Sequence, residues 1–504
     1  MTTRGLYAFN AFNGQVPDGA VGATLFAPWS ELNPAQGAYT WGSLDSQIAL
    51  HALNGHSVSL MVTVSRSGWY GEYLYIDDTP SWVRQGTGVT RSVAIAGKTM
   101  RLPAYDDAGW RAAMQTFVAV LGKRYDGDAR IANVTVGLGL DGETHAYKSD
   151  YETYVTAALG TAYKSAFEMY CKEAISWYDA AFPLTALYVA ANPGGQSFRR
   201  DIIRNYLIPL NIGYKNCGLQ IDDPTAWGPA TYEGQGGNYA LWAPMRDLQS
   251  LLPVWLESTT ATNATAESVY WSLLLGMSWR PAGIDLHAEW FTINPEAIAW
   301  ANGYLAEPER GAWIVLRDRE YGAYSPSIPD SSSMYLSGWP GDYEWGMTRA
   351  SDAPRMLRAT LPLECRDQIE SRQVRSFNEG MTLQVLEPAE LGERLVLRVC
   401  FLERRATFSI AAGEVQKTLG GGASKRMVWQ EWQIDVPSDW DGVIAFAGAA
   451  SVHMVEIRRI GDVGAPAPPP MSLAPPATDE LVQVLRQLSD VLRLLIEVLG
   501  RMTI

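Results

Sequence analysis

Over roughly the first 305 residues, short apolar runs alternate with longer stretches in which apolar side chains recur every three or four positions. Such short runs are typical of buried strands in a parallel sheet, and the longer stretches of amphipathic helices. Helices are predicted near 43–53, 107–124, 151–180, 197–207 and 263–277. Strands are predicted at Leu6–Phe12, Gly22–Pro28, Ser57–Val64, Val134–Leu140, Thr185–Ala191, Cys217–Ile221, Leu252–Leu256 and Ile284–Ala288. This alternation predicts an α/β fold, a (β/α)8 TIM barrel over residues 1–308.

The pattern changes after residue 308, where short β-rich runs follow one another at intervals of about ten residues with Gly, Pro and Asp between them. This spacing predicts a β-sandwich over 309–462, of which 309–360 is either a long connecting segment or the first part of the sandwich. Trp429, Trp432 and Trp440 are candidates either for carbohydrate binding at its rim or for packing. The predicted strands are Ala312–Leu316, Met381–Leu386, Arg394–Phe401, Ala406–Ile410, Trp429–Val436, Gly442–Ala447 and Val452–Ile460.

The last 42 residues combine a proline-rich linker, 463–477, with a single predicted helix, 478–504. A seven-residue apolar repeat along this helix predicts a coiled coil. Leucine at the first repeat position and valine at the fourth favour a trimer or tetramer over a parallel dimer. Docking on another protein, or on a membrane as an amphipathic helix, is the alternative. The repeat comprises Leu481, Leu488, Leu495 and Met502, with Val484, Val491 and Val498 three positions further on.

The fourth predicted strand, Val134–Leu140, ends in a group of polar residues, Asp141, Glu143 and His145. The carboxyl ends of all barrel strands meet at one rim, which is where such folds keep their chemistry. Five of the eight strand ends carry acids, and a carboxylate-lined cleft is therefore expected. The strand-end residues are Trp29, Glu31, Asp141, Glu143, His145, Asn192, Asp222, Asp223, Glu257, His287 and Glu289. Acids at such positions also cap helices or pair with arginine, and a structural role is the alternative for each.

Two segments resemble the barrel β-galactosidases and related retaining glycosidases. Residues 29–45 follow the pattern W-x-x-L-x-P-x-x-G-x-Y-x-W-x-x-L-D of their second βα unit, and 79–82, Thr-Pro-Ser-Trp, resembles their Pro-x-Trp loop beside the sugar. The resemblance implies that Glu143 is the acid/base, Glu257 the nucleophile and Trp82 a sugar neighbour. In that family Asn usually precedes the acid/base, whereas this chain has Gly142. Residues 137–143 are closer to the fourth-strand motif of the inverting β-amylases, which leaves retention or inversion open.

Two carboxyl groups suit this chemistry because glycoside cleavage requires an acid at the leaving oxygen and a carboxylate on the opposite face of the sugar ring. Trp255 or Trp290 is placed in the sequence to raise the pKa of the acid by excluding water. His145 and His287 are expected to hydrogen-bond sugar hydroxyls or to hold the acids. The proposed substrate-binding residues are Trp29, Glu31, Trp82, Asp141, His145, Asn192, Asp222, Trp255, His287 and Glu289.

Composition limits the classes of molecule that this chain is expected to bind. A net charge of −14 argues against nucleic acid and against anionic membranes, whereas 19 Trp and 24 Tyr against 12 Phe favour carbohydrate. The four cysteines are widely spaced, without histidines at ligand spacing, so free thiols, no metal and no cofactor are expected. No basic and apolar leader opens the chain, so we expect no signal peptide and synthesis in the cytoplasm, with release or attachment to a particle left open.

These observations predict a glycoside hydrolase-like protein that acts on or binds a polysaccharide or cell-surface glycan and is multimerised by its C-terminal helix. A phage or other particle-borne surface protein is one interpretation. The alternative is a non-catalytic structural or adhesive protein built on a glycosidase-derived barrel. Glu143 and Glu257 facing each other at a hydrolytic separation would favour the enzyme, and burial of either in a salt bridge would favour the structural protein.

Overall fold

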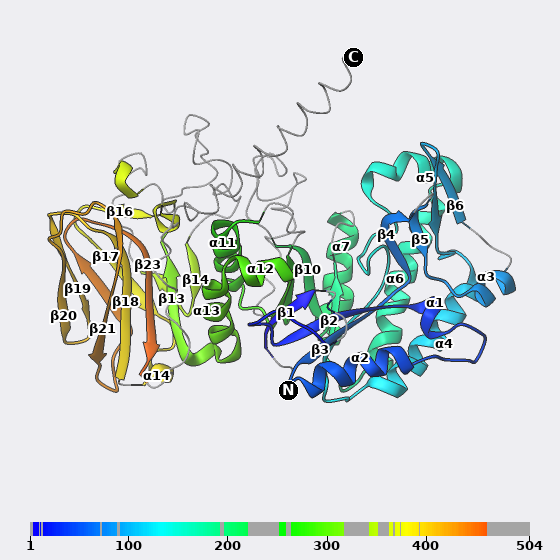
Figure 1. Cartoon of the computed structure of the whole chain (residues 1–504), viewed down its shortest axis with the longest axis horizontal. Helices are drawn as coiled ribbons and strands as arrows, with labels where there is room; N and C mark the ends of the chain where they lie inside the picture. The colour runs from blue at the N-terminus through cyan, green and yellow to red at the C-terminus, as the bar shows by residue number, and fades with distance from the viewer. Residues whose placement is uncertain are drawn as a thin grey trace, which may run out of the picture.

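The computed structural model describes residues 4–9, 11, 14–70, 73–87, 91–191, 196–219, 251–258, 264–316, 342–350, 362–365, 368–372, 374–392 and 394–460. Eight parallel strands close into a barrel, each pairing with the next along the chain and the last with the first (Figure 1). They are β1 (Gly5–Phe9), β2 (Gly22–Pro28), β3 (Ser57–Thr63), β8 (Ile131–Thr135), β9 (Leu187–Ala190), β10 (Gly213–Leu219), β11 (Val254–Ser258) and β12 (Gly283–Leu286). Each overlaps one predicted strand, and the predicted TIM barrel is therefore confirmed.

Helices follow most of the strands. Asp107 caps the helix after the third strand by accepting a 2.8 Å hydrogen bond from the Trp110 amide. The predicted helix 151–180 is two helices, because Gly160 at φ +77° ends the first one. The helices of this region are α1 (Trp29–Leu32), α2 (Gly42–Leu53), α3 (Ser81–Thr87), α4 (Ala108–Tyr125), α5 (Glu152–Leu159), α6 (Ala162–Ala181), α7 (Gln196–Ile202), α8 (Ile208–Leu210), α11 (Ala266–Met277), α12 (Ala288–Ile293) and α13 (Pro295–Ala306).

The barrel interior is aromatic at its N-terminal end. Tyr7, Tyr188 and Trp255 are buried together, with ring centroids 5.0 and 5.3 Å from that of Trp255. Gly283 makes room for this indole, since a Cβ there would lie 2.3 Å from its nearest ring carbon. Successive inward positions on a strand are two residues apart, so the next layers toward the rim hold residues 257, 285 and 287. The apolar layer therefore closes the barrel beneath the polar strand ends.

A small sheet that the sequence pattern did not predict follows β3. Its strands are β4 (Ser65–Tyr70), β5 (Tyr73–Asp77), β6 (Arg91–Ile95) and β7 (Lys98–Leu102), in the order β4-β5-β7-β6. Asp78 anchors it to the barrel: it receives a two-pronged hydrogen bond from Arg66, 2.8 Å at each oxygen, and a 2.8 Å bond from Thr63. The sheet lies beside α5 at the end of the molecule away from the sandwich (Figure 1).

Two antiparallel sheets after the barrel fit a β-sandwich. One has the order β14-β13-β23-β18-β21, with β16 also on β23, and the other β15-β17-β22-β19-β20. Strands at 311–315 and 343–349 belong to these sheets. All seven predicted strands are present, and β14, β15, β16 and β20 are additional. The bounds are β13 (Gly311–Val315), β14 (Tyr343–Trp345), β15 (Met347–Arg349), β16 (Arg375–Phe377), β17 (Gly380–Val385), α14 (Pro388–Leu391), β18 (Arg394–Leu402), β19 (Thr407–Ala412), β20 (Val415–Gly420), β21 (Met427–Asp435), β22 (Val443–Ala447) and β23 (Ala450–Arg459).

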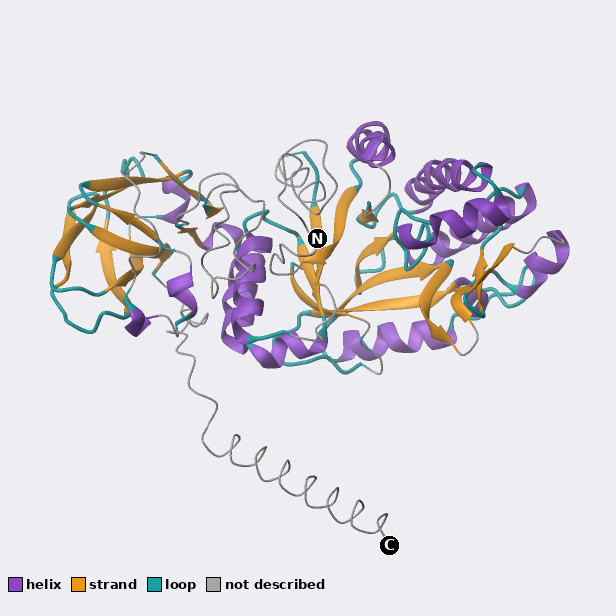
Figure 2. Ribbon diagram, turned by 90° about the horizontal axis from the view of Figure 1, so that it is seen from above, coloured by secondary structure: helices purple, strands orange, loops and turns teal. Residues whose placement is uncertain are grey.

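The barrel and the sandwich share a buried interface made by α11 and α13, which lie between them in both views (Figures 1 and 2). Glu456 on β23 is completely buried there and accepts hydrogen bonds from Trp300, at 3.2 Å, and Tyr304, at 2.6 Å. Arg398 of β18 donates to its other oxygen at 2.7 Å. Arg398 and Arg458 outweigh the effect of burial and lower the pKa of Glu456. The anchor is thus a satisfied buried ion pair that joins both parts.

The three sandwich tryptophans have different settings. Trp429 is partly buried beneath the Arg398 guanidinium, Trp432 packs against the sandwich core, and Trp440 is buried. The predicted linker 463–477 and coiled-coil helix 478–504 lie outside the described residues. Within the described part of the chain, no helix is both long and apolar enough to cross a membrane.

Candidate active site at the barrel rim

A tight turn after β8 presents Glu143. Asp141 and Gly142 both have left-handed backbones, with φ of 55° and 83°, and the amide of Glu143 donates to the carbonyl of Leu140 at 3.0 Å. Gly139 lies so close beneath the turn that a Cβ there would be 2.2 Å from the carbonyl oxygen of His145. Glycine is therefore required where the chain folds back on itself. The turn ends where the Thr144 amide donates to Ala190 of β9 at 3.1 Å.

Gly142 packs directly against β3. A Cβ at this position would lie 2.1 Å from the sulfur of Met61 on β3, closer than any real contact. Asparagine tolerates a left-handed backbone, so the obstacle to it here is Met61.

Asp141 serves the turn itself. Its carboxylate accepts hydrogen bonds from the Ser67 amide at 2.8 Å and the Ser67 hydroxyl at 2.5 Å. The amide of Asp141 in turn donates to Ser65 at 2.9 Å. These bonds tie β4 to the acid-bearing turn, so this predicted sugar contact has a structural function in the described site.

Glu143 is a carboxyl group in a largely dry setting, with 18% of its side chain exposed. Burial, followed by the charges of Glu257 and Asp141, raises its pKa to about 8. Hydrogen bonding to Cys217 and the charge of Lys215 act in the opposite direction. Glu143 is therefore mostly protonated at neutral pH and can donate a proton.

His145 lies next to this acid, with Nδ1 3.3 Å from Glu143 Oε2. Burial lowers the pKa of the imidazole to about 4. Both groups are consequently neutral at pH 7, and the contact between them is not an ion pair.

Glu257 on β11 is also largely buried, but it contacts a cation. Its Oε2 lies 2.7 Å from the Nζ of Lys215, which comes from the neighbouring strand β10 and is completely buried. The same ammonium lies 2.7 Å from Asp285 Oδ2 on β12. Burial raises the pKa of Glu257 above its ordinary value; the charge of Lys215 opposes this rise, and that of Asp285 adds to it. With 15% of its side chain exposed, Glu257 still reaches the rim.

Cys217 links the two acids. It follows Lys215 by two positions on β10, so both side chains point into the barrel. Its thiol hydrogen-bonds the carboxyl groups of both Glu143 and Glu257. Burial and then the charges of the two glutamates raise the pKa of the thiol. The two predicted catalytic residues are thus brought together within reach of one sulfur atom.

Lys215 and Cys217 were not predicted as site residues. The predicted sixth strand began at Cys217 and omitted Lys215, although a lysine in the run Gly213–Leu219 is the signal that was available. A charged residue at an inward position of a buried strand needs a partner, and here the partners are the acids on the next two strands.

An aromatic wall lines the other side of the rim. The ring of Phe9 on β1 lies 4.9 Å from Phe26 on β2 and 5.0 Å from His287 after β12, measured between centroids. The His287 amide donates to Ser258, the residue after Glu257, at 3.1 Å. All three rings are partly exposed, so this wall offers flat apolar surface close to Glu257. Phe9 and Phe26 were not predicted, because phenylalanine in a strand equally indicates packing.

Other predicted substrate-binding residues lie apart from the acids. Trp29 is fully buried against Trp110, with ring centroids 5.5 Å apart. Trp82, on α3, donates a 3.0 Å hydrogen bond from its indole nitrogen to the carbonyl of Asn33. Trp255 lies in the aromatic layer beneath Glu257, and Trp290 is buried in α12. The expectation that Trp255 or Trp290 raises the pKa of the acid by excluding water stays a prediction. Trp29, Trp255 and Trp290 are part of the buried hydrophobic core.

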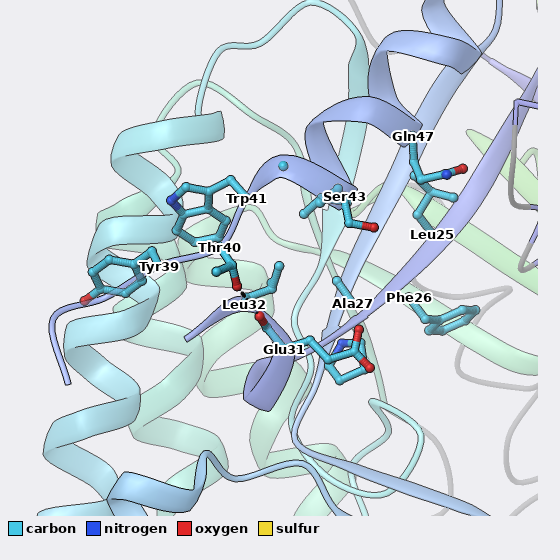
Figure 3. A pocket seen from close by; sticks show the side chains of 13 residues that line it. Leu25, Phe26, Ala27, Glu31, Leu32, Tyr39, Thr40, Trp41, Ser43 and Gln47 are labelled. Atoms are coloured by element: carbon cyan, nitrogen blue, oxygen red, sulfur yellow. Dashed lines mark hydrogen bonds between the residues drawn. The ribbon is translucent and has the colours of Figure 1, made fainter. Parts of the chain in front are cut away.

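Exposed acids at two strand ends also lie outside the cluster. Glu289 is exposed in the first turn of α12, where a negative charge favours the helix. Glu31 is exposed on α1 and lines a pocket of about 770 Å³ between β2 and residues 39–47, with Tyr39 and Trp41 on its wall (Figure 3). None of the acids around Lys215 lines this pocket. Asn192, Asp222 and Asp223 lie outside the described residues.

Within the described ranges, no group of three or more His, Cys, Asp or Glu side chains is arranged to hold a metal ion. All four cysteines are free thiols, of which Cys171, Cys365 and Cys400 are buried and Cys217 is partly exposed.

No protein-family model and no curated protein matches the sequence. Structures with a similar fold are TIM-barrel glycoside hydrolases. The β-amylase catalytic domain from Paenibacillus polymyxa has 11% identity and a TM-score of 0.39 over 57% of this chain and 94% of that one. Xylanase 10B from Thermotoga petrophila, in complex with xylobiose, has 12% identity and a TM-score of 0.36 over 60% and 94%. Xylanase 10B from Thermotoga maritima has 11% identity and a TM-score of 0.37 over 61% of this chain and 96% of that one.

Proposed function

We propose that this protein hydrolyses glycosidic bonds, with Glu143 as general acid and Glu257 as the carboxylate on the opposite face of the sugar. The observation that carries the proposal is the contrast between the two carboxyl groups. Glu143 is protonated near pH 7, whereas Glu257 contacts a buried ammonium at 2.7 Å. Two carboxyls with diverging surroundings are what acid-assisted glycoside cleavage requires.

Retention of configuration is the outcome that we favour. Both carboxyl groups interact with the thiol of Cys217, a proximity that is compatible with the ~5–5.5 Å separation of retaining enzymes. A Glu257 oxygen bonds to the anomeric carbon while the glycosidic oxygen takes the proton of Glu143, so the leaving sugar departs as an alcohol. Glu143 then removes a proton from water, whose oxygen replaces Glu257 at the anomeric carbon. Both glutamates return to their starting states.

The aromatic wall of Phe9, Phe26 and His287 supports a carbohydrate substrate, since flat apolar rings pack against the apolar faces of sugars. We further propose that His145 contacts a sugar hydroxyl beside the acid, because it is neutral and partly exposed there. Glu31, Trp82, Asn192, Asp222 and Glu289 remain proposals as outer contacts of a longer glycan.

The non-catalytic alternative rests on one specific observation. Glu257 is engaged in a salt bridge with a fully buried lysine, an arrangement that also occurs where charges merely stabilise a core. In that case the barrel would bind a glycan without hydrolysing it, or would build a surface structure.

Activity is tested on a panel of polysaccharides by measuring the release of reducing ends. The matched control is the double variant Glu143→Gln, Glu257→Gln, which keeps the size of both side chains. Hydrolysis by the parent and its loss in the control support the proposal. Equal hydrolysis by both proteins refutes the assigned residues, and binding without hydrolysis by either supports the alternative.

We also propose that residues 478–504 assemble several copies of the chain, which would raise avidity for a repeating glycan on a cell surface or particle. The test is the mass of the full chain and of a chain ending at residue 463, measured by light scattering. A trimeric or tetrameric parent and a monomeric truncation are expected. An unchanged mass after truncation would refute this role.

A further inference from the structure

Lys215 sits at the centre of a chain of contacts that crosses the barrel beneath the rim. Its Nζ lies 2.7 Å from Glu257 Oε2 on one side and 2.7 Å from Asp285 Oδ2 on the other. The second oxygen of Asp285 accepts a 2.6 Å hydrogen bond from the hydroxyl of Thr24 on β2. Lys215, Asp285 and Thr24 are all fully buried, so four strands fix this arrangement away from solvent.

We propose that Lys215 is a positioning residue that holds Oε2 of Glu257 and favours the ionised form of this carboxylate, which leaves the acid role to Glu143. The inference rests on the proposed function and adds to it the device that separates the two roles. Lys215 lies beneath the acids and holds an oxygen of Glu257, so it acts through this residue and not on the substrate.

The charges around the ammonium explain the division. Three carboxyl groups surround one positive charge, and only Asp285 and Glu257 touch it. Glu143 is left without direct contact to a cation and takes the proton. The titratable groups that face Glu257 or Lys215 are Asp285 from β12, Cys217 from β10, Glu143 from the turn after β8, and Tyr7 from β1 below Asp285.

Asp285 and Lys215 act on Glu257 with opposite signs. The charge of Asp285 favours the protonated form of Glu257, whereas that of Lys215 favours the ionised form. Removing each charge in turn must therefore move the titration of Glu257 in opposite directions. If Lys215 and Asp285 only supported the fold, removing them would not shift the titration of Glu257 in opposite directions.

The first measurement needs no substrate. Glutamate side-chain carboxyl carbons are labelled with 13C and titrated by NMR, and Glu143→Gln and Glu257→Gln assign the two signals. In Lys215→Met the titration of Glu257 is expected to move to higher pH, and in Asp285→Asn to lower pH. Lys172→Met, which removes a partly exposed lysine from its 2.5 Å pair with Asp201 on the barrel surface, is the matched control and should leave both signals unchanged.

The second measurement is the pH profile of kcat/KM on a hydrolysed glycan. Lys215→Met should lose roughly tenfold or more activity at the acidic end of the profile, relative to its own optimum, because Glu257 becomes protonated there. In Asp285→Asn the acidic limb of the profile should move to lower pH. If Lys215→Met does not fold, the titration of Glu257 in Asp285→Asn tests the inference alone. A shift to lower pH supports it, and any other result overturns it.

An unchanged Glu257 titration in folded Lys215→Met, or shifts of the same sign in both variants, would overturn the inference. NMR shifts of opposite sign in a protein that hydrolyses no glycan would uphold the electrostatic device and refute the proposed function. The two failures are thus distinguishable.

Discussion

Gly142 and Met61 lie so close that a side chain at residue 142 fits only if the end of the Met61 side chain moves. A Cβ would lie 2.1 Å from the Met61 sulfur, and φ is +83°. Glycine meets both conditions without any rearrangement of its neighbours.

Gly142→Ala should destabilise the fold by about 1–2 kcal/mol for the left-handed backbone and about 1–3 kcal/mol more for overpacking. Gly160→Ala is the matched control, because Gly160 has φ +77° but nothing within 4 Å of a Cβ, and should show only the first contribution. Urea denaturation measures both. Equal losses in the two variants would mean that Met61 moves aside freely.

Glu143→Gln should stabilise the protein increasingly as pH rises. The folded pKa is about 8 and lies above the ordinary 4.5, so the unfolded chain releases this proton first and stability falls with pH between these values. The full effect is on the order of a few kcal/mol. Melting temperatures of parent and variant should agree near pH 4 and diverge by pH 8.5.

Glu152→Gln serves as the control, since Glu152 is an exposed partner of Lys164. A variant at residue 143 that follows the parent at every pH would contradict the protonated state.

Cys217 should be the first of the four cysteines to react with iodoacetamide in the native protein, because the other three are buried. The reaction should be slow, since burial and the neighbouring acids raise the pKa of the thiol. Glu257→Gln should accelerate it by removing one of those charges. Peptide mapping by mass spectrometry identifies the modified residue, and early labelling of Cys171, Cys365 or Cys400 would refute the assignment.

Much of the fold followed from the alternation of apolar runs, which placed all eight barrel strands and seven sandwich strands. The sheet β4–β7 was missed because its short strands are polar and rich in Ser, Tyr and Arg. Glu143 and Glu257 could be proposed from strand ends and family resemblance. Trp255 could not be separated from a sugar platform, since its depth depends on Gly283, a partner on another strand.

Glu456→Ala should destabilise the chain by roughly 3–5 kcal/mol, because it strands Arg398 and removes acceptors from Trp300 and Tyr304 at the barrel–sandwich interface. Glu431→Ala is the control: this half-exposed partner of Arg398 should contribute less than about 1 kcal/mol. Urea denaturation followed by tryptophan fluorescence measures the change. A Glu456 variant that resembles the control would show that the buried pair does not join the two parts.

The central claim is that Glu143 is the general acid, and leaving-group dependence tests it most directly. Glu143→Gln should cleave a dinitrophenyl glycoside of the accepted sugar with a kcat/KM close to that of the parent, because this leaving group needs no proton. Its kcat on this substrate should fall, because Glu143 also removes the proton from water in the second step. The variant should lose ~10²–10⁴-fold on the natural glycan, and the alkaline limb of kcat/KM near pH 8 should disappear with the aryl substrate. Equal losses of kcat/KM on both substrates, or an alkaline limb that persists in Glu143→Gln, would contradict the account.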